Sequence, residues 1–417
     1  MGYIDILGQR AQAVKAELAQ ASTDQKNDAL LEIAHILRNS MAEIIDANGV
    51  DIANGKMKKM SESLLDRLAL TEGRIESMAS ACESLAKMED PVGEIVSGSV
   101  RPNGMRIEKI RVPMGVIGMI YEARPNVTVD AAILCLKSGN AVILRGGKEA
   151  INSNKCLADL MRTAVRRAGF SEDIIQLVED TDRGIALDMM KANEYIDVLI
   201  PRGGAQLIKA VVQTATVPVI ETGTGNCHVY VDSSADINMA VDIVDNGKTQ
   251  RPSVCNAVET CLVHRDVAER FLPKLKARLD QHNVEIRGCE MTAQILGSAN
   301  VVPADEEDYA TEFGDYIIAI KVVDDLAEAF EHIARYSTGH SECIVTESLF
   351  SAEEFKKRID AAAVYVNCST RFTDGEQFGL GAEIGISTQK LHARGPMGLK
   401  EMTTTKFVIT GNGQIRK

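Results

Sequence analysis

Cys255 is the residue whose type and sequence surroundings point most directly to chemistry. It lies in the stretch NGKTQRPSVCNA, where Lys248 and Arg251 are close enough along the chain to favour a thiolate. A cysteine titrates near ~8.5 and reacts only as its thiolate, so neighbouring cations increase its reactivity and also attract an anionic substrate. The stretch therefore predicts a nucleophile on a turn held by Gly247 and Pro252. It fits a buried structural cysteine equally well, because most cysteines outside disulfides are buried.

Length and composition indicate a soluble, globular protein of two or three domains. The 417 residues exceed what a single hydrophobic core usually serves. Of these residues 45% are apolar and 25% are charged, and no apolar run is long enough to span a bilayer. The N-terminal residues lack the basic flank and apolar run of a secretion signal. We therefore expect a cytoplasmic protein without a membrane partner.

The charge balance and the cysteines exclude further classes. A net charge of −13 argues against nucleic acid or an anionic membrane as partner, so an anionic substrate would need a local basic pocket. The nine cysteines lack the paired spacing of a disulfide framework, which fits a reducing compartment. Cys261 and His264 form one Cys-x-x-His pair, but no second pair stands at zinc-finger distance. We expect no metal site.

The chain begins with a helical region and then changes to strands. Residues 4–90 have helical periodicity, and Ser22 with Gln25 makes a capping-box pattern. Residues 94–112 read as a basic hairpin, and the tail 402–411 reads as a closing strand. A protruding ribbon can pair with another subunit, because its edge offers unpaired backbone groups.

The next region alternates apolar strands with helices, which indicates a parallel sheet covered on both faces. The predicted strands are 116–120, 141–144, 174–178, 197–200 and 217–220, and the predicted helices are 129–136, 150–168, 185–192 and 206–214. A second set follows, with helices 235–246 and 268–282 and strands 259–264, 316–323, 343–345 and 364–367. Ser351 and Glu354 predict the start of another helix by the capping-box pattern.

Three loops at the carboxyl ends of the first set of strands combine a cation with glycine or proline. They read YEARPN (121–126), RGGKE (145–149) and PRGG (201–204). Ligands of parallel sheets bind at this edge, and the two double-glycine loops lead into helices whose N-termini could hold phosphate. Neither the Gly-x-Gly-x-x-Gly fingerprint nor a P-loop is present, which argues against a short-chain dehydrogenase and a P-loop NTPase.

Two long strings carry a resemblance to a known family. They are EHIARYSTGHSE at 331–342, and GLGAEIGIST at 379–388 continuing to LHARGPMGL at 391–399. With the order of the elements, they make the chain resemble the aldehyde dehydrogenase superfamily over nearly its whole length, and most closely its γ-glutamyl phosphate reductase family. The Cys255 stretch and VNC at 366–368 match the wider superfamily.

The resemblance implies an α/β, aldehyde dehydrogenase-like fold with two parallel-sheet domains, one for the cofactor and one for catalysis, plus a β-ribbon oligomerisation element. It places an NADP-binding domain at 1–231, with the 94–112 hairpin as oligomerisation arm. The catalytic cysteine domain would span 232–370. Residues 371–417 would return to the cofactor domain and end in an oligomerisation tail, so we expect a homodimer or homotetramer.

The resemblance also assigns catalytic roles. Cys255 corresponds to the superfamily's catalytic thiol. Asn126 corresponds to the amide that binds the developing oxyanion together with the backbone N–H of the cysteine. Glu221 lies where oxidising members keep the base that activates water. A reductase acting on an acyl phosphate needs no hydrolysis, so we expect Glu221 to be less critical than Cys255.

The cofactor implied by the resemblance is NADPH/NADP+. Arg145 and Lys148 fall on the loop that meets the adenine ribose, where basic residues are consistent with a 2′-phosphate. The other predicted cofactor contacts are Arg202, Gly203 and Gly204 at the turn under the pyrophosphate, and Glu312 and Phe313 at the nicotinamide ribose.

The implied reaction is the NADPH-dependent reduction of L-glutamyl 5-phosphate to L-glutamate 5-semialdehyde and phosphate through a cysteine thioester, the second step of proline biosynthesis from glutamate. Because the substrate carries phosphate and an α-carboxylate, Arg251 and Arg394 are the predicted substrate-binding cations, and Lys390 fits an exposed charge better. Association with glutamate 5-kinase stays open.

Alternative functions remain at this point. The chain could be another acyl-phosphate or aldehyde dehydrogenase of the same superfamily. A cysteine acyltransferase or hydrolase would use Cys255 with a histidine and without a nicotinamide, and a non-catalytic nucleotide-binding or scaffolding protein would use the fold alone.

Overall fold

The computed structural model describes residues 2–416, without the side chain of Ser63, and divides them into two compact units. The first unit contains the chain up to Thr222, then Gly379–Gly385 and the tail from Met397. The second unit contains Gly223–Phe378 and Ile386–Pro396. Each unit has its own sheet and its own core.

The boundary between the units differs from the expected one at 231/232. Strand β7 (Cys227–Val231) pairs in parallel with β8 (Val258–His264) and β12 (Ser341–Val345), so it belongs to the sheet of the second unit. The expected return at 371–417 is also interrupted, because 386–396 lies in the second unit and contains a small antiparallel pair, β14 (Ile386–Ser387) and β15 (Gly395–Pro396).

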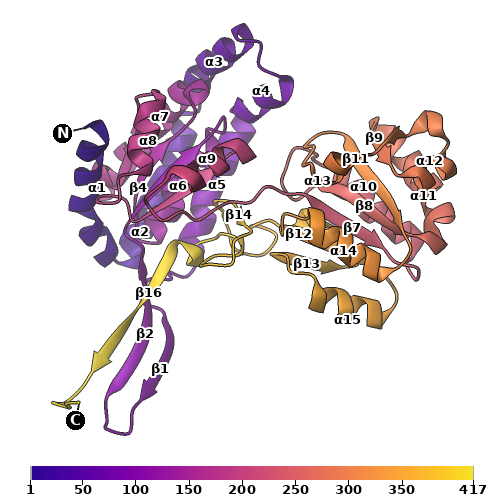
Figure 1. The fold of residues 1–417 in the computed structure, drawn as a ribbon. Coiled ribbons are helices and arrows are strands. Elements are labelled where there is room, and N and C mark those ends of the chain that lie inside the picture. Colours follow the sequence, from indigo (N-terminus) through magenta and orange to yellow (C-terminus); the bar gives the residue numbers. More distant parts are fainter. Residues whose placement is uncertain (1, 417) are drawn as a thin grey trace. The chain divides into compact units, whose positions relative to one another are not determined.

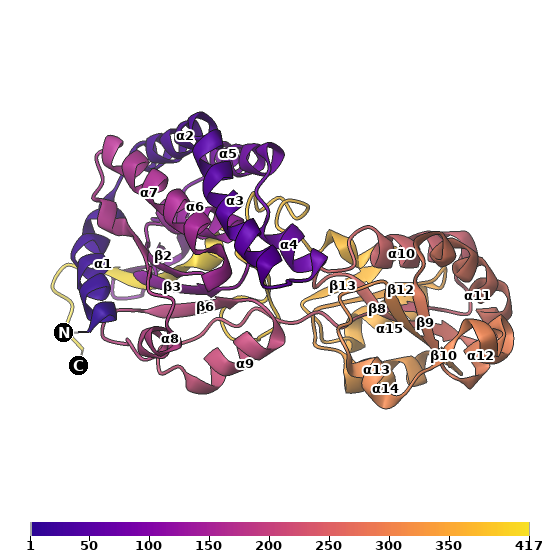
Figure 2. The same ribbon diagram turned by 90° about the horizontal axis from the view of Figure 1, so that it is seen from above.

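The first unit is built on a parallel sheet with strand order β5-β4-β3-β6, and its helices cover both faces (Figures 1 and 2). Strands β3 and β4 consist almost entirely of buried residues, as expected for a parallel sheet with two covered faces. The strands are β3 (Val116–Tyr121), β4 (Ala141–Arg145), β5 (Ile175–Leu177) and β6 (Val198–Arg202). The helices are α1 (Tyr3–Gln20), α2 (Thr23–Asn39), α3 (Met41–Met57), α4 (Glu62–Leu68), α5 (Glu72–Lys87), α6 (Asn126–Lys137), α7 (Ile151–Arg167), α8 (Arg183–Met190) and α9 (Ala205–Thr214).

A separate antiparallel ribbon extends from the first unit (Figure 1). It contains β1 (Ile95–Val100), β2 (Arg106–Pro113) and β16 (Thr403–Thr410), with β2 in the middle. The predicted hairpin and the predicted closing strand are therefore partners in one sheet. Both outer strands expose apolar side chains, including Val100 and Phe407, which suits the predicted, untested role in oligomerisation.

The second unit is a parallel sheet with strand order β10-β9-β11-β8-β7-β12-β13. Alternating residues of β7 point to opposite faces: Val229 and Val231 pack with α10 and α11, whereas Tyr230 packs with α14 and α15. The remaining strands are β9 (Glu285–Gly288), β10 (Val302–Pro303), β11 (Ile317–Val323) and β13 (Ala363–Val366). The helices are α10 (Ile237–Thr249), α11 (Arg265–Leu279), α12 (Glu290–Leu296), α13 (Glu306–Ala310), α14 (Leu326–Tyr336) and α15 (Leu349–Arg358).

Most predicted elements are present, but two were wrong. Residues 217–220 do not form the predicted strand. Only an isolated bridge joins Val219 to Leu199 of β6, because the chain runs beside β6 for a short distance after α9. Helix α15 begins before the predicted cap, since the Ser348 hydroxyl accepts from the Ser351 amide. The capping box of Ser22 and Gln25 is confirmed. In the described part of the chain, every helix is too short or too polar to cross a bilayer.

Candidate functional site

The backbone of Cys255 is fixed by the segment that enters the second unit. Cys255 is half-buried on the loop between α10 and β8. Its carbonyl oxygen accepts a hydrogen bond from Cys227 Sγ at 3.2 Å. A Cβ atom on Gly225 would lie 1.4 Å from the same oxygen, so only glycine fits there. All nine cysteines lie in the described residues, and none forms a disulfide.

The predicted turn around Cys255 begins later than expected. Gly247 lies inside α10, where a Cβ would meet Val258 Cγ2 at 2.4 Å, so its role is close packing of the helix on β8. Because the helix continues to Thr249, Lys248 points into the core. There Lys248 Nζ pairs with Glu259 Oε2 at 2.6 Å, which corrects the expectation that its charge is available to the thiol.

The buried Lys248–Glu259 pair also holds the loop that contains Glu312 and Phe313. Lys248 donates to the Asp315 carbonyl at 3.0 Å, and Glu259 accepts from the Gly314 amide at 3.1 Å. Burial raises the pKa of Glu259 to about 7 and lowers that of Lys248, while their mutual attraction opposes both shifts.

Glu312 and Cys255 are brought together through Gly225. The Glu312 carboxylate accepts from the Gly225 amide at 3.1 Å, and Gly225 itself packs on the Cys255 carbonyl. Phe313 lies under the Arg287 guanidinium, with 5.1 Å between the Arg287 Cζ atom and the ring centroid. The structure thus places one predicted cofactor residue next to the segment that fixes the predicted nucleophile.

Arg371 is a residue of this site that the sequence reasoning missed. It lies on a short 3-10 turn, Thr370–Phe372, more than a hundred residues beyond Cys255. Its guanidinium donates to Gln250 Oε1 at 2.9 Å and to Asn256 Oδ1. Nothing in its spacing along the sequence connects it to Cys255.

The two predicted cations near the C-terminus share one carboxylate. Arg394 Nη1 lies 2.7 Å from Asp360 Oδ1, and Lys390 pairs with Oδ2 of the same residue. The two cations lower the pKa of Asp360. Both line a cavity of about 570 Å³ in the second unit, together with Thr338 and Thr388. Arg394 could reach a ligand there only in competition with Asp360.

In the first unit, Asn126 is the first residue of α6, and its side chain is oriented by Asp130. Asn126 Nδ2 donates to Asp130 Oδ2 at 2.9 Å, which uses one amide hydrogen and leaves the other for a ligand. Burial raises the pKa of Asp130 to about 6, opposed by the Asn126 hydrogen bond and by Arg202. The sequence analysis overlooked Asp130, although a spacing of four residues places both on one helix face.

Arg145 and Lys148 follow strand β4, as predicted. Arg145 ends the strand, is partly buried, and donates to the Asp182 carbonyl at 3.3 Å. Burial lowers its pKa, while the carboxylates of Glu149, Asp180 and Asp182 act in the opposite direction. Lys148 begins the next 3-10 turn and is exposed. An exposed lysine beside a partly buried arginine can accommodate a phosphate group.

Arg202, Gly203 and Gly204 lie where the strand order reverses. Strands β4 and β6 flank β3 on opposite sides, so the carboxyl ends of β3 and β6 form a topological switch point, the usual place for a nucleotide. The Gly204 amide, at the N-terminus of α9, donates to Glu122 Oε2 at 2.8 Å. The amide predicted to bind phosphate is therefore already paired with the Glu122 carboxylate. A dinucleotide could bind there only after the Glu122 side chain moves away.

Glu221 stands one residue before Thr222, where the chain leaves the first unit for the second, and is half-buried. The next residue, Thr222, donates from its hydroxyl to the Pro201 carbonyl at 2.6 Å, which holds this strand-like segment beside β6. The structure thus fixes the backbone at Glu221 without showing a catalytic role for its carboxylate.

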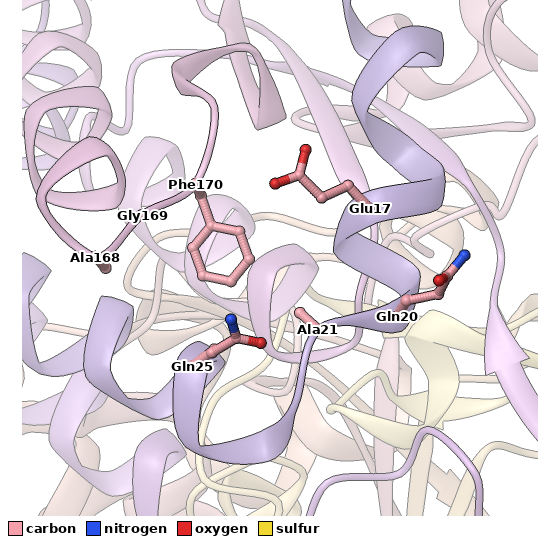
Figure 3. Close-up of a pocket in the computed structure, with 7 residues that line it drawn as sticks. All are labelled: Glu17, Gln20, Ala21, Gln25, Ala168, Gly169 and Phe170. Carbon is pink, nitrogen blue, oxygen red and sulfur yellow. The ribbon is translucent and has the colours of Figure 1, made fainter.

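Other polar features lie apart from these residues. A cavity of about 280 Å³ in the first unit is lined by Glu17 and Gln20 of α1, Gln25 of α2 and Phe170 (Figure 3). No predicted site residue lines it. Among residues 2–416, no group of three or more His, Cys, Asp or Glu side chains could hold a metal ion.

Comparisons with known proteins place the chain in a family. The model of the aldehyde dehydrogenase family matches residues 4–299 and 300–408. The chain belongs to the aldehyde dehydrogenase family. It is 57% identical over 411 residues to a gamma-glutamyl phosphate reductase of Clostridium perfringens, covering 99% of both chains. A reductase of the same name from Halothermothrix orenii is 58% identical over 408 residues, covering 98% of this chain and 97% of the relative.

Solved structures agree with this family. The crystal structure of gamma-glutamyl phosphate reductase from Thermotoga maritima matches with a TM-score of 0.96 and 50% identity, covering 100% of both chains. An acetylating aldehyde dehydrogenase from Geobacillus thermoglucosidasius, 17% identical with a TM-score of 0.72, covers 99% of this chain and 97% of its own and shares the fold. The predicted resemblance and fold class are confirmed, whereas the roles of single residues stay predictions.

Asp130 should make stability depend on pH. Its folded pKa of about 6 lies above the ordinary 3.8, so its contribution is fully present below the ordinary pKa and is lost as pH rises through about 6. Asp130→Asn removes this titration. At ~1.4 kcal/mol per pKa unit, wild type should lose roughly 3 kcal/mol relative to the variant between pH 4 and pH 8. Urea unfolding followed by circular dichroism at both pH values measures this difference.

Asp28→Asn, at an exposed carboxyl of α2, is the control and should change stability equally at the two pH values. A difference between wild type and Asp130→Asn that does not vary with pH would contradict the raised pKa.

Proposed function

We propose that the protein reduces L-glutamyl 5-phosphate to L-glutamate 5-semialdehyde and phosphate with NADPH, through a thioester on Cys255. Membership of the aldehyde dehydrogenase family and full-length relatives named gamma-glutamyl phosphate reductase support the reaction. The observation that carries the mechanism is the fixation of Cys255 by Gly225 and Cys227, with Glu312 bonded to the same Gly225. The reaction would be the second step of proline biosynthesis from glutamate, in the cytoplasm.

Cys255 would act as the nucleophile. Its thiolate attacks the γ-carbonyl carbon, the new C–S bond forms, and the C–O bond to phosphate breaks with its electron pair leaving on phosphate. The bound nicotinamide supplies the hydride for the second step. The C–S bond of the resulting thiohemiacetal then breaks, which regenerates the thiol and releases the semialdehyde. Cys255 is half-buried, and the hydrogen bond from Cys227 to its carbonyl oxygen fixes the backbone from which the thiol projects during both steps.

The oxyanion would be stabilised by Asn126 and by the backbone N–H of Cys255. Loss of one such donor typically costs ~100 to 1000-fold in rate. Asp130 orients the Asn126 amide, so this donor is preorganised before substrate arrives. Glu221 would contribute little, because water attacking the thioester would waste the substrate.

Arg145 and Lys148 would hold the 2′-phosphate of NADPH, and Arg202, Gly203 and Gly204 would meet the pyrophosphate. Glu312 and Phe313 would hold the nicotinamide ribose. Arg251, which is exposed on the Cys255 loop, and Arg394 would bind the substrate's anionic groups. The ribbon formed by β1, β2 and β16 would join subunits into a homodimer or homotetramer, and glutamate 5-kinase would be a candidate partner.

The reverse reaction tests the function. Purified protein with glutamate semialdehyde, NADP+ and inorganic phosphate should form NADPH, because phosphate is needed to cleave the thioester. The same assay without phosphate should give a small burst no larger than the enzyme concentration, followed by little turnover. Absorbance at the NADPH band measures both. Steady turnover without phosphate would instead indicate a hydrolysing aldehyde dehydrogenase. If no NADPH formed at all, the proposed function would be refuted.

Cys255→Ser should abolish semialdehyde formation, since a serine hydroxyl is a far weaker nucleophile at neutral pH. NADPH binding, followed by nicotinamide fluorescence, should persist because the cofactor contacts do not include the sulfur. Cys368→Ser, at another half-exposed thiol of the same unit, is the matched control and should keep its activity. Substantial turnover by Cys255→Ser would contradict a covalent intermediate on Cys255.

Lys148→Glu should raise the KM for NADPH at least tenfold more than the KM for NADH. The carboxylate would repel the 2′-phosphate, which NADH lacks, whereas the exposed position of Lys148 predicts an intact fold. Steady-state kinetics with both cofactors measures the two values. Lys191→Glu, exposed after α8, serves as a charge-matched control. Equal changes in the two KM values would contradict a role at the 2′-phosphate.

A further inference from the structure

The Arg371 guanidinium is held across the loop that carries Cys255. It donates from Nε to Gln250 and from Nη1 to Asn256, which stand before and after Cys255 on the same loop. These two acceptors fix the plane of the guanidinium, so its position does not depend on a flexible side chain finding its place. A positive charge fixed in this way can stabilise a negative charge without first having to reorient.

The backbone around Arg371 is attached to the residue that follows Cys255. The Thr370 hydroxyl donates to the Asn256 carbonyl at 2.7 Å, and Asn256 Nδ2 donates to the Thr373 carbonyl at 2.9 Å. Asn256 and Thr370 are buried, so water does not compete with these bonds. The Arg371 turn and the Cys255 loop therefore form one rigid arrangement within the second unit.

The Arg371 guanidinium donates to neutral groups, whereas two of the cations described above are paired with carboxylates. Lys248 is paired with Glu259, and Arg394 with Asp360. The hydrogen-bond acceptors of the Arg371 guanidinium in residues 2–416 are neutral amide oxygens. Burial lowers the pKa of Arg371 and the charge of Arg251 lowers it further, whereas a Cys255 thiolate raises it, followed by the Asp374 carboxylate and a Cys227 thiolate.

The effect of a Cys255 thiolate is reciprocal. If a thiolate on Cys255 favours the charged guanidinium, the guanidinium favours the thiolate by the same free energy. Arg251 and Cys255 both lie between Gln250 and Asn256, the two residues that hold the Arg371 guanidinium, and the charge of Arg251 opposes that of Arg371. Two cations that repel each other are stabilised when an anion lies between them.

We propose that Arg371 is the cation that stabilises the Cys255 thiolate and, with Arg251, receives the phosphate that leaves when the thioester forms. The phosphate part rests on the proposed function, whereas the thiolate part does not need it. In the step concerned, the C–S bond forms, the C–O bond to phosphate breaks, and the electron pair leaves with the phosphate oxygen. Arg371 and Arg251 offset the charge that develops there, and no oxidant or reductant takes part.

The thiolate part is tested without substrate, by the pH dependence of alkylation. Wild type, Arg371→Met and Arg371→Lys are treated with iodoacetamide from pH 6 to pH 10, and modification at Cys255 is followed by peptide mass spectrometry. Loss of the charge should move the midpoint upward by about one pH unit, which is about tenfold slower alkylation at pH 7. Arg371→Lys should restore most of the rate.

Arg358→Met is the matched control, because this arginine of the same unit stacks on Phe330, with 4.5 Å from its Cζ atom to the ring centroid, and contacts neither Gln250 nor Asn256. Its alkylation profile should match wild type. If circular dichroism shows that Arg371→Met does not fold, Arg371→Gln takes its place, because it removes the charge and keeps an amide donor for Asn256. An unchanged midpoint in a folded, charge-free variant would show that Arg371 only ties its turn to the loop, and would overturn the proposal.

The phosphate part is tested in the reverse reaction with inorganic phosphate. Arg371→Lys should raise the KM for phosphate at least tenfold more than the KM for semialdehyde, because it loses the planar donor pair that fits phosphate. Equal changes would overturn this part. Wild type that forms no NADPH would refute the proposed function, while a shifted alkylation midpoint would still uphold the role of Arg371 at the thiolate.

Discussion

The buried ion pair between Lys248 and Glu259 is the interaction on which the arrangement around Cys255 depends. Both side chains are fully buried, where a single unpaired charge would cost about 3–5 kcal/mol. Lys248 lies in the last turn of α10 and Glu259 is the second residue of β8, so the pair joins the two ends of the Cys255 loop. Its remaining hydrogen bonds go to Gly314 and Asp315. One pair thus sets the positions of the Cys255 loop and of the loop that carries Glu312.

The fold was predictable from the sequence because its signals are local. Apolar runs such as 141–144, the capping box of Ser22 and Gln25, and glycine-containing turns each need only a few neighbouring residues. The failures occurred where distant contacts decide. Residues 217–220 have the composition of a strand but make one bridge, and Ser348 begins α15 because the fold presents its hydroxyl to Ser351. The boundary between the units lies before β7, and not after it as predicted, because β7 pairs with β8 and β12.

The site was predictable only as far as each residue could be recognised by itself. Cys255, Asn126 and Arg145 stand at ends of elements that the sequence defines. Contacts between distant segments could not be recognised in this way. Arg371 donates to Gln250, which lies more than a hundred residues earlier in the sequence, and Asp360 pairs with Arg394 from another segment. Lys248 shows the opposite error. Nearness in sequence suggested a cation for the thiol, but one further turn of α10 directs it into the core.

The N-terminus of α9 carries an amide that is predicted to meet a phosphate group and that Glu122 now occupies. An unpaired amide there would be costly if buried and would attract any anion if exposed. Glu122 instead accepts from Gly204, and a Cβ on Gly203 would lie 2.7 Å from the same carboxylate oxygen. Because Glu122 is exposed, its release costs one hydrogen bond, roughly 1 kcal/mol. A pyrophosphate group, which carries two negative charges, could accept from the same amide and so offset this loss.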